Sequence, residues 1–152
     1  MMQDNEHLEV ISRGVHIGGG RILLCHTKGA TNTYLPGGHV DFGESSKTAL
    51  SREIEEELGL TCNVRDFMGV VEHMYEDESG KHCEINLVFR MDIPDLTPDQ
   101  QPVSREDYIE FLWADTENIE KSRLEPASLC GCLREWISRT GGDGFRIGPA
   151  DG

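Results

Sequence analysis

An acidic helical segment bounded by glycines constrains this chain more than any other feature. Residues 38–60 read GHVDFGESSKTALSREIEEELGL. Ser45 and Ser46 are candidate N-caps for a helix over residues 45–58, and Gly59 is a natural C-terminal stop. The helix would carry one apolar stripe with a spacing of four residues, formed by Leu50, Ile54 and Leu58. The segment therefore predicts an amphipathic helix that packs on a sheet.

Three carboxylates share a second face of this helix. Glu53, Glu56 and Glu57 stand at positions i, i+3 and i+4. Like charges at this spacing repel one another, so an isolated run of this kind is usually a solvated face. Arg52 beside the cluster, Glu44 upstream and the flanking glycines favour a built site instead. Clustered carboxylate oxygens suit a hard divalent cation, which would be Mg²⁺ or Mn²⁺.

The rest of the chain predicts one α/β domain. Apolar segments rich in β-branched residues predict strands, whereas longer periodic segments predict helices. We expect strands over residues 8–17, 21–26, 60–75, 82–93 and 108–114. We expect further helices over residues 116–120 and 126–139. The domain is predicted to cover residues 1–140, and the glycine-rich residues 141–152 to form a flexible C-terminal tail.

Charge and composition narrow the classes of partner. The sequence has 14 basic and 28 acidic residues, a formal net charge of −14. Because long nucleic acids are bound mainly through phosphate neutralisation, this excess argues against them. The five cysteines form no C-x-x-C pair, and no apolar run reaches the length of a membrane span. The sequence therefore predicts a cytoplasmic protein that does not bind membranes.

The segment also matches a family signature. With the spacing G-x5-E-x7-R-E-U-x-E-E-x-G-U, in which U is a bulky aliphatic residue, the chain carries Gly38, Glu44, Arg52, Glu53, Ile54, Glu56, Glu57, Gly59 and Leu60. This pattern resembles the signature of the MutT-like Nudix hydrolases at every defined position. The resemblance implies an α/β/α sandwich with a mixed sheet. It also implies Mg²⁺-dependent cleavage of a nucleoside diphosphate linked to another moiety by a metal-activated water.

The same resemblance implies roles for individual residues. Magnesium would be bound by the backbone carbonyl of Gly37 and by Glu53, Glu56 and Glu57. Arg52 and Glu44 would orient the helix and its glutamates. A further glutamate after the central strands would contact the metal or the water. Glu106 is the candidate for this role, with Asp107, Glu110 or one of the helix glutamates as alternatives.

The sequence leaves the substrate open. Tyr75 follows Leu60 by 15 residues, near the position where relatives that cleave dinucleoside polyphosphates carry a tyrosine, and it is a candidate substrate contact. Relatives that act on ADP-ribose tend to have a proline there, which this chain lacks. Nucleotide sugars and oxidised nucleoside triphosphates are further candidates. The alternative functions are a nucleotide sensor without hydrolysis and an RNA-end pyrophosphohydrolase. The sequence also leaves open whether the protein forms a homodimer.

Overall fold

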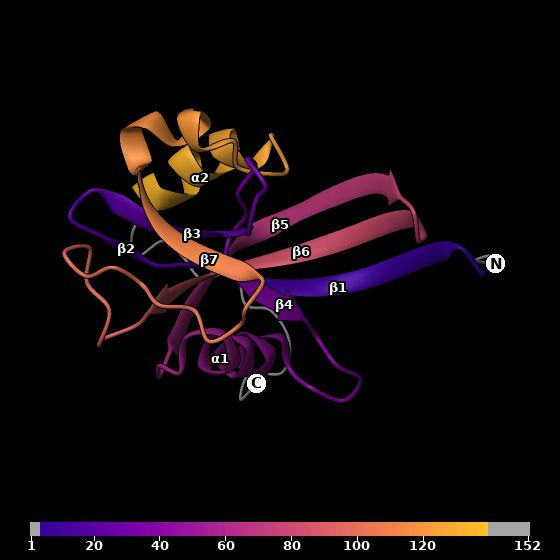
Figure 1. Ribbon diagram of the computed structural model, residues 1–152, viewed down its shortest axis with the longest axis horizontal. Helices are drawn as coiled ribbons and strands as arrows, with labels where there is room; N and C mark the ends of the chain where they lie inside the picture. The colour runs from indigo at the N-terminus through magenta and orange to yellow at the C-terminus, as the bar shows by residue number, and fades with distance from the viewer. Residues whose placement is uncertain (1–3, 140–152) are drawn as a thin grey trace.

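The computed structural model describes residues 4–139 (Figure 1). Its strands are β1 (Glu6–Val15), β2 (Ile17–Gly18), β3 (Arg21–Thr27), β4 (Gly37–His39), β5 (Asn63–Asp77), β6 (Gly80–Asp92) and β7 (Ile109–Asp115). Its helices are α1 (Ser46–Leu58), the 3₁₀ helix η1 (Thr116–Ser122) and α2 (Leu129–Ser138). The strands and helices predicted from the sequence are therefore present.

The strands form two sheets. The larger sheet has the order β4-β1-β6-β5 and is mixed, because β1 runs parallel to β6 while the β1–β4 and β5–β6 pairs are antiparallel. The smaller sheet has the order β2-β3-β7, with both pairs antiparallel. The β1–β6 pairing joins segments more than seventy residues apart, for example Arg13 opposite Val88. Side chains from distant parts of the chain consequently meet on one sheet surface.

Helix α1 begins and ends where the local sequence predicts. The Ser45 side chain accepts a hydrogen bond from the backbone N–H of Thr48, and Gly59 closes the helix in the left-handed conformation at φ 69°. The predicted stripe of Leu50, Ile54 and Leu58 is buried. It packs on residues of both sheets, including Phe89, Met91, Leu23 and Phe111. The apolar stripe thus fixes α1 on the sheets.

A second hydrophobic core lies on the other side. Leu129 and Leu133 of α2 pack with Ile119 of η1 and with sheet residues that include Val15 and Val88. Figure 1 shows α1 on one side of the strands and α2 on the opposite side. This layering confirms the predicted α/β/α sandwich with a mixed sheet, and the smaller antiparallel sheet is an addition to that prediction.

Several boundaries differ from the sequence prediction, including those at the turn after β5 and at the last helix. The turn between β5 and β6 contains only residues 78 and 79, because the strands pair as far as Asp77 and Gly80. The last helix begins at Leu129, three residues after the predicted start at Pro126. The tail predicted over residues 141–152 lies outside the described residues. Within residues 4–139, no helix is long and apolar enough to cross a membrane.

Strand β4 passes through a narrow space between β1 and α1. Gly37 has φ 142°, and a Cβ atom there would lie 1.9 Å from the backbone oxygen of Ser12. At Gly38 a Cβ atom would lie 2.3 Å from the carboxyl carbon of Glu53. Only glycine allows this approach, so the pair brings the β4 backbone against the acidic face of α1.

We predict that Gly37→Ala lowers the free energy of unfolding by about 2–4 kcal/mol, because the methyl group collides with backbone and not with a movable side chain. Gly29→Ala is the matched control. Gly29 also has positive φ, 86°, but a Cβ atom there would meet no heavy atom within 4 Å, so we expect a loss of only about 1 kcal/mol. Urea denaturation measures both. Equal losses would contradict the steric account of β4.

Candidate functional site

Arg52 organises the acidic face of α1. Its guanidinium group makes a two-pronged contact with Glu44, with Nε–Oε2 and Nη2–Oε1 distances of 2.8 and 3.0 Å. Nη1 donates to Glu53 at 3.1 Å and to Glu56 at 3.2 Å, and Nη2 donates to the backbone oxygen of His39 at 3.0 Å. The hydrogen bond to Arg52 lowers the pKa of Glu44. One arginine therefore connects β4, the loop before α1 and two helix glutamates.

Glu57 is a buried carboxylate. Its exposed fraction is only 7%, and its Oε2 atom has no hydrogen-bond partner among residues 4–139. Burial, followed by the charge of Glu53, raises the pKa of Glu57 to about 8, while Arg13 opposes the rise. Because a buried carboxylate with an unpaired oxygen is costly, this group has capacity for a cationic ligand.

Glu53 lies beside Glu57, and its negative charge contributes to the raised pKa of Glu57. Burial raises the pKa of Glu53, and the positive charge of Arg52 acts in the opposite direction. The Gly38 backbone approaches the Glu53 carboxyl closely. The Glu53–Glu57 pair therefore lies at the junction of α1 and β4, whereas Glu56 is further out, with half of its side chain exposed.

These residues fit a hard divalent cation in their chemistry. Within the described part of the chain, no three His, Cys, Asp or Glu side chains are already arranged around a common metal position. Nη1 of Arg52 donates to both Glu53 and Glu56, so these two carboxylates converge on the guanidinium group. The unpaired oxygen of Glu57 and the adjacent Glu53 carboxyl nevertheless supply the oxygen ligands that Mg²⁺ takes. Gly37 immediately precedes Gly38, whose backbone approaches the carboxyl group of Glu53.

The loop before β7 is attached to the end of α1. The backbone N–H of Arg105 donates to the backbone oxygen of Glu57 at 2.7 Å. Within the loop, the hydroxyl of Ser104 accepts from the backbone N–H of Glu106 at 3.0 Å. The charge of Glu106 contributes to the raised pKa of Glu57. Of the three downstream candidates, Glu106 is half-buried beside the helix glutamates, whereas Asp107 and Glu110 are exposed.

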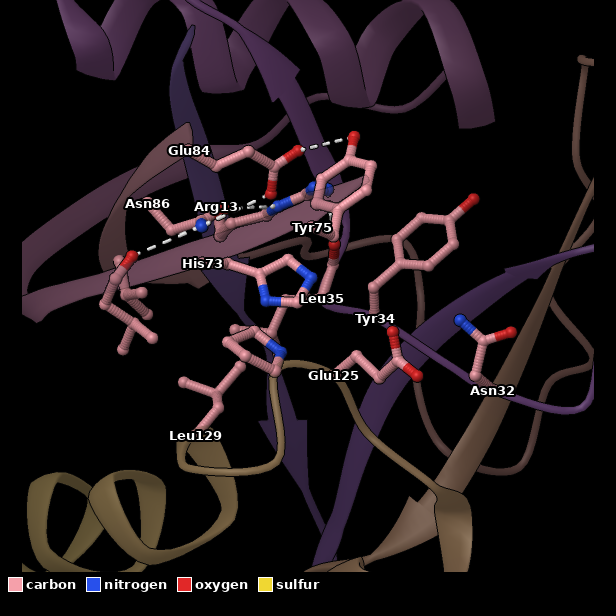
Figure 2. Close-up of a pocket in the computed structure, with 13 residues that line it drawn as sticks. Arg13, Asn32, Tyr34, Leu35, His73, Tyr75, Glu84, Asn86, Glu125 and Leu129 are labelled. Carbon is pink, nitrogen blue, oxygen red and sulfur yellow. Dashed lines mark hydrogen bonds between the residues drawn. The ribbon is translucent and has the colours of Figure 1, made fainter. Parts of the chain in front are cut away.

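A cavity of about 320 Å³ lies on the α2 side of the larger sheet (Figure 2). Its floor comes from β1, β5 and β6, and its walls come from residues 32–35 and from the segment before α2. Arg13 lines this cavity and also acts on the pKa of Glu57. It donates from Nε to Asn86 at 3.2 Å and from Nη1 to the Leu35 backbone oxygen at 3.0 Å. Arg13 therefore lines the cavity while its positive charge also acts on the acidic site.

Tyr75 lines the same cavity. Its ring stacks on His82 with centroids 4.5 Å apart and on His73 with centroids 5.1 Å apart. Burial, followed by the charge of Glu84, raises the pKa of Tyr75 to about 12, so its hydroxyl keeps its proton at neutral pH. The structure thus brings the predicted substrate contact to a cavity, with its ring engaged by two histidines.

Sequence reasoning did not identify Arg13, Glu84 or Asn86. Arg13 interrupts the apolar strand sequence Ile-Ser-Arg-Gly-Val, and Glu84 and Asn86 alternate with apolar residues in β6. A charged or amide residue at an inward-facing position of a strand can be recognised in the sequence as a candidate functional residue. Their convergence depends on the β1–β6 register, which the local sequence does not specify.

The chain is similar in sequence to known proteins. A family model described as NUDIX domain matches residues 10–130. The chain is 42% identical to an ADP-ribose pyrophosphatase of Methanocaldococcus jannaschii over 59 residues, which are 39% of this chain. The match spans 34% of that relative, about a third of its length.

Solved structures share the fold. A NUDIX hydrolase from Nitrosomonas europaea superposes with a TM-score of 0.69 at 19% identity, covering 96% of this chain and 99% of the other. A MutT protein from Methanosarcina mazei Go1 superposes with a TM-score of 0.65 at 24% identity, covering 88% and 96%. At these identities the similarity concerns the fold.

The burial of Glu57 predicts how stability depends on pH. The pKa of Glu57 is raised in the folded state from an ordinary value of 4.5 to about 8, so the folded state holds a proton that the unfolded state has lost between these values. Stability should fall as pH rises through this window, and the loss should be complete above it. In EDTA, we therefore expect Glu57→Gln to raise the melting temperature, by more at pH 8 than at pH 5.

Glu55→Gln is the matched control, because Glu55 is exposed on the same helix. We expect Glu55→Gln to change the free energy of unfolding by no more than about 0.5 kcal/mol, and this change should not grow with pH. Calorimetry between pH 5 and 8 measures both variants. A melting temperature of Glu57→Gln that lies below that of the wild type at pH 8, in the absence of metal, would contradict the burial account.

Proposed function

The chain belongs to the NUDIX domain family, and on this premise we propose that it is a pyrophosphohydrolase that cleaves a nucleoside diphosphate linked to another moiety. The observation that carries the proposal is the buried Glu57 carboxylate, with its unpaired oxygen and its neighbour Glu53, on an intact family signature. A module that only senses nucleotides would not need this costly pair.

The proposed metal ligands are Glu53, Glu56 and Glu57, with the backbone carbonyl of Gly37. Bound Mg²⁺ would stabilise negative charge on the phosphates and lower the pKa of water at the reacting phosphorus. Mn²⁺ has the same preference for oxygen ligands and would substitute. Cation binding would offset the repulsion between Glu53 and Glu57, which supports the assignment of these two residues.

Arg52 and Glu44 act as positioning residues in this proposal. Arg52 holds Glu53 and Glu56 at their present rotamers and is itself held by the two-pronged contact with Glu44. A planar guanidinium restricts the orientation of a carboxylate more than a lysine could. Arg13, which lines the cavity and whose charge acts on Glu57, would supply positive charge to the phosphates of a substrate.

Glu106 is the proposed general base. Its loop is attached to α1 through the bond from Arg105 to the Glu57 backbone, and its side chain is half-buried. From this position its carboxylate would accept the proton that the attacking water loses as the new phosphorus–oxygen bond forms. The bond to the leaving phosphate then breaks, and one water molecule is consumed for each cleavage.

The cavity is the proposed site for the nucleoside. It is lined by Tyr75 and by other residues of β1, β5 and β6, and it is adjacent to the acidic site through Arg13. The relative named ADP-ribose pyrophosphatase supports a nucleoside diphosphate linked to a second group as the type of substrate. The surplus of 28 acidic over 14 basic residues supports a small substrate and not a long nucleic acid.

The test is hydrolysis by the purified full-length chain with Mg²⁺. The panel contains ADP-ribose, dinucleoside polyphosphates, nucleotide sugars, NADH and nucleoside triphosphates, and the products are separated by chromatography. We expect metal-dependent cleavage of an anhydride bond in at least one class, and its loss in Glu57→Gln but not in Glu55→Gln. Equal turnover by Glu57→Gln would contradict the site. Tight binding of a panel member without cleavage would support the nucleotide sensor instead.

We predict that Glu106→Gln lowers kcat by about 10²-fold or more, because proton transfer by a positioned side chain contributes on that scale. The Mg²⁺ concentration for half-maximal rate should change little if Glu106 acts on the water and not on the metal. Asp107→Asn is the matched control, since the neighbouring Asp107 is exposed, and its kcat should stay within about twofold. A kcat for Glu106→Gln equal to that of the control would exclude Glu106 as the base.

A further inference from the structure

Glu84 is a buried carboxylate that faces the cavity (Figure 2). It lies on β6, and its exposed fraction is 9%. The hydroxyl of Tyr75 donates to Oε2 at 3.5 Å, and the amide Nδ2 of Asn86 donates to Oε1 at 3.5 Å. Both distances are at the long limit of a hydrogen bond, and each carboxylate oxygen can accept two. Glu84 therefore has accepting capacity left for a ligand in the cavity.

The side-chain amide of Asn86 has no comparable capacity to accept a hydrogen bond from a ligand. Its Oδ1 atom accepts from Nε of Arg13 at 3.2 Å, and its Nδ2 atom donates to the backbone oxygen of Val71 at 3.2 Å. These bonds fix the orientation of the amide, so its Nδ2 group also points toward Glu84. The two oxygens of Glu84 form an acceptor pair on the cavity floor, which also includes the guanidinium group of Arg13.

Aromatic rings lie next to this acceptor pair. A row of stacked rings crosses the larger sheet, from His7 through His82 and Tyr75 to His73. Tyr75 and His73 line the cavity, together with the apolar side chains of Leu35, Val71, Val88 and Leu129. The Tyr75 ring is already stacked on two histidines, so the cavity offers mainly an apolar lining with a carboxylate at its edge, which suits a planar heterocycle that carries N–H donors on one edge.

From this arrangement we propose that the cavity selects guanine as the base of the substrate, with Glu84 as the specificity-determining residue. Guanine presents two adjacent donors, N1–H and the 2-amino group, which match two carboxylate oxygens. Adenine presents a donor beside the N1 acceptor, whose lone pair would face a carboxylate oxygen. Hypoxanthine keeps N1–H but lacks the amino group. Only guanine among these three purine bases satisfies both oxygens, and an unpaired buried acceptor is costly.

This inference rests on the proposed function for the placement of the nucleoside, but it is tested without hydrolysis. Guanosine, inosine and adenosine 5′-monophosphates contain no anhydride bond, so each can be titrated calorimetrically into the full-length chain with Mg²⁺ present. We expect the guanosine nucleotide to bind at least about 100-fold more tightly than the adenosine nucleotide. The inosine nucleotide should fall between them, about tenfold weaker than the guanosine nucleotide.

Glu84→Gln is the decisive variant. Glutamine offers one donor and one acceptor, so it should lose the guanosine preference and bind the adenosine nucleotide better than the wild type does. Glu72→Gln is the matched control, because Glu72 is an exposed carboxylate on the neighbouring strand β5 and does not line the cavity. Its preference should match the wild type. Circular dichroism and melting temperature establish that both variants are folded.

The outcomes separate the two proposals. An equal or greater affinity of the wild type for the adenosine nucleotide would overturn the guanine assignment. So would a guanosine preference that persists in folded Glu84→Gln. Metal-dependent hydrolysis without base preference would leave the proposed function standing and remove this inference. Selective guanosine binding with no cleavage of any guanosine diphosphate compound would support the base site and contradict the hydrolase.

Discussion

The burial of the Glu57 carboxylate against its neighbour Glu53 is the constraint on which the rest of the site depends. Folding removes this group from water with one oxygen unpaired, an arrangement that destabilises the metal-free protein. The apolar stripe of α1 compensates, because Leu50, Ile54 and Leu58 bury their side chains on the adjacent face of the same helix. The protein thus places a strained acidic pair on one of its best-packed elements.

Two further features keep this pair in place. Arg52 joins Glu44, Glu53 and Glu56 in one charge-assisted network, which fixes the outer half of the acidic face. Gly38 of β4 brings backbone close to the Glu53 carboxyl group, and a side chain there would require Glu53 to move. On the other side of the sheet, Arg13 connects Glu57 with the cavity that carries Glu84. Through the charge of Arg13, the proposed metal site is thus linked electrostatically to the proposed base site.

The sequence predicts the features of the site that depend on neighbouring residues. It does not predict the contacts between residues that are far apart in the chain. The limits of α1, its apolar stripe and the common face of Glu53 and Glu57 follow from helical periodicity and from the caps at Ser45 and Gly59. The cavity does not, because Arg13 and Glu84 belong to strands whose parallel pairing joins positions more than seventy residues apart. Their register is set by the packing of the whole sheet, so only the structure shows that their side chains meet.

We propose that the Glu53–Glu57 pair binds a divalent cation. Titration of the purified chain with Mn²⁺, followed by electron paramagnetic resonance of the free ion, measures this directly. The account predicts saturable binding to the wild type, competition by Mg²⁺, and a loss of at least about tenfold in affinity for Glu57→Gln but not for the exposed Glu55→Gln. Equal Mn²⁺ affinity in the wild type and Glu57→Gln would contradict it.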